Sequence, residues 1–118
     1  EPLWLGIDGI DMDEQIASEL MVNQSTGILV VGIISDGPAD KAGLEGGYRI
    51  TDINGTQIEL GGDIIITADK QPIENLRDMS TYISNNKIEG DTINLGILRD
   101  GKPQEIEVTL EARPMNER

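Results

Sequence analysis

Residues 35–44 read SDGPADKAGL and residues 62–65 read GDII, and these two stretches carry the strongest structural signals in the chain. Asp36-Gly37 has the composition of a turn. Pro38 suits the first position of a helix, where its missing N–H costs no hydrogen bond, and Gly43 suits the left-handed residue that ends one. The pattern predicts a short helix over 38–42, followed later by an isoleucine-rich strand over 63–67.

Strands and helices are expected on both sides of this stretch. Residues 27–34 form a nearly continuous Ile/Leu/Val run, which is typical of a strand buried on both faces. Two more strands, over 92–98 and 104–110, flank an Asp-Gly turn at 99–102. Amphipathic spacing predicts helices over 11–22 and 74–86, and Leu5 to Ile7 is expected to be a short strand.

A hairpin is expected over residues 48–60, because Asn54-Gly55 favours a two-residue turn between alternating segments. Such a turn pairs Ile53 with Thr56, Thr51 with Ile58 and Arg49 with Leu60. Residues 47–58 also resemble residues 62–73 in the order glycine, strand, turn and isoleucine. Since the second copy leads directly into the long helix, we assign it to the main sheet and treat the first as an insertion.

Composition excludes several classes of function. The 118 residues suit one domain, and they include no cysteine and no histidine, which removes thiolate and imidazole metal sites and a Ser-His-Asp triad. A net charge of −13 argues against nucleic acid and against direct binding to an anionic membrane. The carboxylates Asp11, Asp13 and Glu14 lack the spacing of a calcium loop and are interpreted as helix N-terminal charge. No metal and no cofactor is expected.

Trp4-Leu5-Gly6-Ile7 is an apolar run interrupted by one glycine. Glycine lets neighbouring N–H groups turn into a small concavity, which binds an anion without a basic side chain. A peptide C-terminus is such an anion. The alternative is an edge strand of the core.

Residues 35–44 together with 62–65 resemble the signature of PDZ domains. The groove strand comes first, as in the permuted PDZ domains of HtrA/Deg serine proteases, and the ending ILRDGK…VTL also resembles them. The resemblance implies an α+β, mostly β fold: a five- to six-stranded, partly open barrel or sandwich with two or three helices and an inserted hairpin at about 47–61. We expect the domain to cover 1–112 and a flexible tail to cover 113–118.

The resemblance also implies a peptide site. A partner strand would add beside Leu5-Gly6-Ile7, with its carboxylate on the N–H groups of these residues and Trp4 beneath the loop or at the pocket rim. Leu5 and Ile7, on one side of a regular strand, would line a pocket for an apolar last residue. Met79 and Ile83 would face it from the long helix, although ordinary core positions would have the same spacing.

The sequence therefore predicts a non-catalytic module that binds C-termini or exposed hydrophobic segments for substrate recognition or regulation. The chain begins at Glu1 without Met, as expected for a segment of a longer protein whose protease domain is a further partner. By resemblance, that parent works outside the cytoplasm or tethered to a membrane. Alternatives are the PDZ module of a membrane-linked metalloprotease, or an assembly domain whose groove is filled by its own or a neighbouring chain.

The acidic excess has two interpretations. It is either a solvated surface that keeps the chain soluble, or an electrostatic preference for peptides with basic residues upstream of the C-terminus. The second requires association rates that depend on salt, and rates independent of ionic strength would exclude it.

Overall fold

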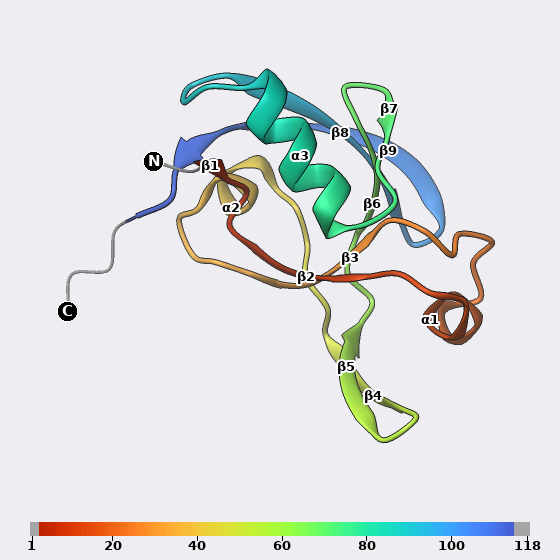
Figure 1. Cartoon of the computed structure of the whole chain (residues 1–118). Helices are drawn as coiled ribbons and strands as arrows, with labels where there is room; N and C mark the ends of the chain where they lie inside the picture. Colours follow the sequence, from red (N-terminus) through yellow and green to blue (C-terminus); the bar gives the residue numbers. More distant parts are fainter. Residues whose placement is uncertain (1–2, 115–118) are drawn as a thin grey trace.

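The computed structural model describes residues 3–114, which form three helices and ten strands (Figure 1). The elements are β1 (Leu3–Trp4), β2 (Ile7–Asp11), α1 (Glu14–Leu20), β3 (Ile28–Ile33), α2 (Pro38–Ala42), β4 (Arg49–Ile53), β5 (Thr56–Leu60), β6 (Ile64–Ala68), β7 (Gln71–Pro72), α3 (Leu76–Asn86), β8 (Thr92–Arg99), β9 (Lys102–Thr109) and β10 (Glu111–Ala112).

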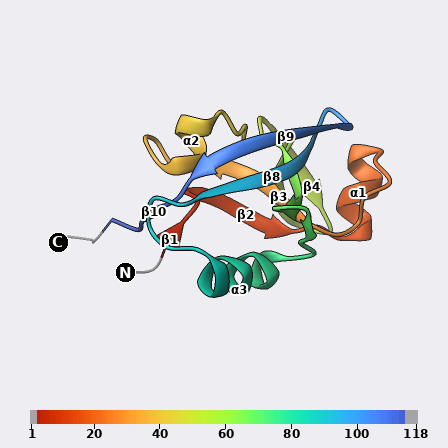
Figure 2. The same ribbon diagram turned by 90° about the horizontal axis from the view of Figure 1, so that it is seen from above.

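The main sheet has the strand order β2-β3-β6-β8-β9, with β7 attached to β6, and all its pairs are antiparallel. Two small sheets accompany it, the hairpin β4–β5 and the pair β1–β10 that brings the ends of the described chain together (Figures 1 and 2). The sheets stay open and do not close into a barrel. The expectation of a mostly β fold with two or three helices is confirmed, and the described residues contain three.

Local turn chemistry is confirmed at two places. Helix α2 covers Pro38–Ala42, and Gly43 ends it in the left-handed region at φ 94°. Hairpin β4–β5 has the predicted register, with Arg49 opposite Leu60 and Ile53 opposite Thr56. It forms a separate two-stranded sheet while β6 joins the main one, as predicted for the two similar segments.

Near the N-terminus one predicted strand is wrong, and a predicted helix is present with shorter bounds. Leu5 to Ile7 is not a regular strand, because Gly6 has φ +79° and breaks the chain between β1 and β2. The helix predicted over 11–22 begins only at Glu14, where the Asp13 carboxylate accepts a hydrogen bond from Ile16 N at 2.8 Å. Asp11 belongs to β2 instead, because pairing with β3 outweighs its helical pattern.

The bounds of the other predicted elements agree with the structure to within a few residues. Helix α3 begins at Leu76, capped by the Asn75 side chain, rather than at 74. Strand β3 is buried over Ile28–Val30 but only half-buried over the next three residues. Of the expected tail, Arg113 and Pro114 are exposed, and 115–118 lie outside the described residues.

Apolar side chains form two layers, one on each face of the β2–β3 pair. The first layer lies between the main sheet and α2 and α3 and includes Leu5, Ile28, Met79 and Ile83. The second lies under α1 and hairpin β4–β5 and includes Leu29 and Leu60. Strand β2 thus separates α3 from the hairpin.

A buried ion pair explains the aspartate in the GDII stretch. Asp63 is 1% exposed, and its two carboxylate oxygens accept 2.8 Å hydrogen bonds from Nε and Nη2 of Arg99. Arg99 Nη2 also donates to the carbonyl of Gly43 at the end of α2, at 2.9 Å. The hydrogen bond to Asp63 raises the pKa of Arg99 above its usual value. One ion pair therefore holds the end of α2 against β6 and β8.

We expect Arg99→Ala to lower the free energy of unfolding by about 3–5 kcal/mol, because it leaves the Asp63 carboxylate buried without a cation. The control is Lys41→Ala, which removes an exposed ion pair with Glu111. Exposed pairs contribute little, so the control should unfold at the same urea concentration as the parent chain. Equal losses in urea unfolding of the two variants would contradict this account.

Candidate functional site

A groove between β2 and α3 is the main cavity at the candidate site, with a volume of about 560 Å³. We call it the α3 groove. The structure brings all six predicted residues to its lining: Trp4, Leu5, Gly6, Ile7, Met79 and Ile83. The other lining residues are Leu3, Ile28, Leu76, Ser80, Ser84, Lys87 and Arg113. No residue of 47–61 lines it, so the inserted hairpin leaves the groove open.

The end of the groove is formed by a bend at Leu5-Gly6 that is fixed against α2. The Leu5 carbonyl accepts a hydrogen bond from Ala39 N at 2.8 Å, and the Gly6 carbonyl accepts one from Ile34 N at 2.9 Å. A Cβ on Gly6 would lie 3.1 Å from Cδ of Pro38. Both the positive φ and this close approach require glycine.

Three backbone amides at this bend donate no hydrogen bond within the described residues. The N–H groups of Leu5 and Gly6 donate no hydrogen bond to any residue in 3–114. Hydrogen-bonded and non-bonded pairs alternate along an antiparallel ladder. Since Gly6 bonds to Ile34, the N–H of Ile7 points away from β3, toward the open edge. Together the amides offer three donors to an outside acceptor.

The apolar side chains of the groove also belong to the core. Leu5, Met79 and Ile83 are buried in the first apolar layer, and half-buried Ile7 packs against it. The two interpretations of Met79 and Ile83, core and groove wall, therefore describe the same side chains. Leu5 and Ile7 line the cavity as predicted, but the predicted reason, that they lie on one side of a regular strand, is wrong. The bend at Gly6 turns both side chains toward the cavity.

Trp4 lies at the rim between the two ends of the described chain. Its strand pairs with β10, and the Arg113 guanidinium carbon lies 5.7 Å from the centre of the indole ring, within range of a cation–π interaction. The indole Nε1 is buried, without a hydrogen-bond partner within the described range.

Some groove residues had a sequence signal and others had none. Leu76 shares a helix face with Met79 and Ile83, and Lys87 follows Ile83 by four residues. The helical period could therefore have predicted Leu76 and Lys87 as groove residues. Leu3 and Arg113 reach the groove through the β1–β10 pairing, which no local pattern indicates.

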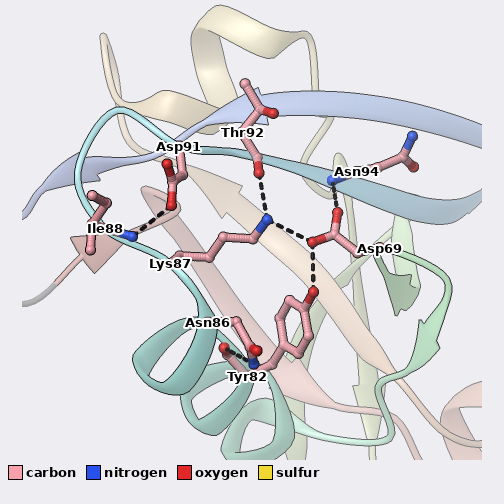
Figure 3. Close-up of polar contacts among 8 residues, drawn as sticks. All are labelled: Asp69, Tyr82, Asn86, Lys87, Ile88, Asp91, Thr92 and Asn94. Atoms are coloured by element: carbon pink, nitrogen blue, oxygen red, sulfur yellow. Dashed lines mark hydrogen bonds and ion pairs between the residues drawn. The ribbon is translucent and has the colours of Figure 1, made fainter.

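A polar network holds the C-terminal half of α3 to the sheet (Figure 3). The Asp69 carboxylate, in the β6–β7 turn, accepts hydrogen bonds from Tyr82 Oη at 2.6 Å, Lys87 Nζ at 2.7 Å and Asn94 N at 2.8 Å. Lys87 also donates to the Thr92 carbonyl at 2.8 Å. The network fixes the distance between the helix and the sheet, and so the width of the groove.

The network also shifts the titration of its members. Burial disfavours the charged form of Asp69, but the hydrogen bonds from Lys87, Tyr82 and Asn94 outweigh it and lower the pKa of its carboxyl to about 2. The hydrogen bond with Asp69 raises the pKa of Lys87 and that of Tyr82. Lys87 is therefore a fixed cation on the groove wall.

The lowered pKa of Asp69 stabilises the fold above about pH 4, and this contribution is lost as the pH falls toward 2. We expect Asp69→Asn to lower the free energy of unfolding by about 1–2 kcal/mol at pH 7, with the difference shrinking as the pH falls and vanishing below pH 2. The control is Asp100→Asn, at an exposed turn position where asparagine tolerates the positive φ. Denaturant unfolding across this pH range checks the expectation, and a loss of stability independent of pH would contradict it.

The curated relatives of this chain are proteases much longer than it. It is 32% identical over 111 residues to a "Probable periplasmic serine endoprotease DegP-like" from Marinomonas sp. (strain MWYL1), and 30% identical over 107 residues to the "Periplasmic pH-dependent serine endoprotease DegQ" of Escherichia coli (strain K12). These matches cover 94% and 91% of this chain but only 20% of each relative.

Solved structures agree with the architecture. The HtrA-type protease AlgW with a decapeptide superposes with a TM-score of 0.72 at 26% identity, over 98% of this chain and 30% of that one. The HtrA3 PDZ domain bound to the phage-derived ligand FGRWV has a TM-score of 0.69 at 15% identity, over 96% and 95% of the two chains, and shows the shared fold. The PDZ domain family model matches residues 5–110. The chain therefore belongs to the PDZ domain family.

Proposed function

We propose that the α3 groove binds the C-terminal segment of a partner protein as an added strand, with an apolar last residue. The observation that carries this proposal is the set of three amides of Leu5, Gly6 and Ile7, unpaired within the described residues, at the end of the groove, next to its apolar side chains. Amide donors at the end of such a groove suit a carboxylate attached to an apolar side chain.

Strand β2 supplies the backbone partner. It is an edge strand of the main sheet, so one side of Ile7–Asp11 has unpaired peptide groups. A peptide whose carboxylate lies at Leu5-Gly6-Ile7 extends along this edge antiparallel to β2. Its course follows α3, whose first residue Leu76 donates from its N–H to the Asp11 carboxylate at the far end of β2, at 2.8 Å.

The side chain of the last peptide residue would enter the apolar end of the groove. Leu5, Ile7, Met79 and Ile83 offer only hydrocarbon and thioether surface there, which favours an aliphatic or aromatic residue. Met79 adapts to side chains of different shape. The AlgW structures with a decapeptide and with a tripeptide, each 26% identical to this chain, support peptide binding by this fold.

We place the domain in a larger serine endoprotease that works outside the cytoplasm, where it recognises substrates or regulates the protease domain of the same chain. The DegP-like and DegQ relatives, described as periplasmic, support this, and the match over residues 5–110 supports a domain within 1–112. No histidine lies in the sequence, so a Ser-His-Asp triad would have to lie elsewhere in the parent. The open groove argues against a module filled by its own hairpin.

The test compares two glycines with nearly equal φ, Gly6 at +79° and Gly101 at +77°. A Cβ at Gly101 meets nothing within 4 Å, whereas one at Gly6 presses on Pro38. We expect Gly6→Ala to weaken binding of the tripeptide Val-Ala-Val about tenfold or more, because the amides move away from the carboxylate.

Gly101→Ala is the matched control, which carries a comparable backbone strain far from the groove and should bind normally. Titration calorimetry gives both affinities, and circular dichroism verifies that each variant is folded. Equal affinity of a folded Gly6→Ala variant, or no binding by the parent chain, would contradict the proposal.

A further inference from the structure

A second cavity, of about 360 Å³, lies on the other face of the β2–β3 pair. Ile10 of β2 and Val31 of β3 line one wall, and residues of hairpin β4–β5, among them Ile50 and Glu59, line the other. We call it the hairpin cavity. Figures 1 and 2 show β2 running between α3 on one side and the hairpin on the other.

The side chains of β2 alternate between the two cavities. Ile7 lines the α3 groove, a Cβ at Gly9 would lie 3.5 Å from Leu76 Cδ2, and the Asp11 carboxylate bonds to the Leu76 N–H. Ile10 instead packs in the second apolar layer and lines the hairpin cavity. Asp8 points the same way, over Gly32 of β3. Both faces of the strand that would pair with a peptide therefore lead to a cavity.

A peptide strand beside β2 must present its side chains in the same alternation. Directly opposite residues of an antiparallel pair share a face, with Cβ atoms about 4.5–5.5 Å apart. If the last residue lies opposite Ile7, the fourth from the C-terminus lies opposite Ile10. Its side chain then points away from α3, toward the cavity that Ile10 lines.

We propose that the hairpin cavity is a second specificity subsite, which takes a long cationic side chain, lysine or arginine, at the fourth position from the peptide's C-terminus. This inference rests on the proposed function of the α3 groove. The inserted hairpin then contacts the peptide side chain that points away from α3.

The charges and exposure of the cavity walls favour a cationic side chain with an apolar stem. Ile10, Val31 and Ile50 offer aliphatic surface to the stem, while Glu59 is the charged residue of the lining. Asp8 adds a carboxylate on the same face of β2. Arg49, a cation of the same hairpin, shares a face with Thr51 and Ile58. It is not among the lining residues, and its Nη1 donates a hydrogen bond to Thr51 Oγ1 at 3.2 Å. Lysine and arginine side chains combine such a stem with a charged end.

Calorimetric titrations test the subsite by measuring the affinities of three hexapeptides, Gly-Ala-Xaa-Val-Ala-Val, in which Xaa is Arg, Ala or Glu. The tripeptide Val-Ala-Val, which ends before the fourth position, serves as the reference. We expect the Arg peptide to bind about fivefold more tightly than the Ala peptide, and the Glu peptide to bind most weakly. Ile50→Ala and Glu59→Gln should each reduce the Arg preference, and the double variant should abolish it. Neither substitution should change the affinity for Val-Ala-Val, which does not reach the cavity.

Ile88→Ala is the matched control, since Ile88 is 73% exposed, Ile50 is 65% exposed, and Ile88 lines neither cavity. It should keep the full Arg preference.

Equal affinity for the three hexapeptides, or an Arg preference that survives the double variant, would overturn the subsite while leaving the proposed function of the α3 groove intact. A peptide-free dimer in sedimentation that Ile50→Ala dissociates would overturn it in favour of a second copy of the chain. Failure of Val-Ala-Val to bind would overturn the proposed function and the subsite together.

Discussion

The left-handed bend at Gly6, packed against the first turn of α2, is the constraint on which the site depends. It ends one short strand and starts another, so the peptide groups between them do not pair within the sheet. The carbonyls of Leu5 and Gly6 bond to α2 and to the residue after β3, which turns the opposite sides of these peptide groups outward. A side chain at position 6 would press on Pro38 and remove this geometry. The bend therefore turns the N–H groups of Gly6 and Ile7 outward at fixed positions, beside the N–H of Leu5, which is unpaired within residues 3–114.

Two buried or half-buried polar clusters hold the elements around that bend. The Asp63–Arg99 ion pair fastens the end of α2, the helix against which Gly6 packs. The Asp69 network fastens α3, the opposite wall of the groove, to β6 and β8 (Figure 3). Neither cluster contributes donors to the closed end of the groove. Both hold the walls of the groove in place.

The sequence contained most of the fold because its signals are local. Pro38, Gly43 and the Asn54-Gly55 turn each specify a backbone conformation, and all three lie where they were predicted. The N-terminal region was harder, since the helix predicted over 11–22 includes Asp11, which pairs with β3 instead. The six predicted site residues lie together, but Arg113 reached the same cavity only through pairing of distant strands. The hairpin cavity depends on which way the insertion folds, which turn residues alone do not determine.

In the proposed complex, the amides of Leu5, Gly6 and Ile7 receive a peptide carboxylate. The most direct measurement is an NMR titration of ¹⁵N-labelled chain with Val-Ala-Val, compared with the same peptide carrying a C-terminal amide. We expect large downfield amide-proton shifts at these three residues with the free acid, and much smaller shifts at the same peptide concentration with the capped peptide. Identical shifts with both peptides, or shifts confined to other parts of the chain, would contradict it.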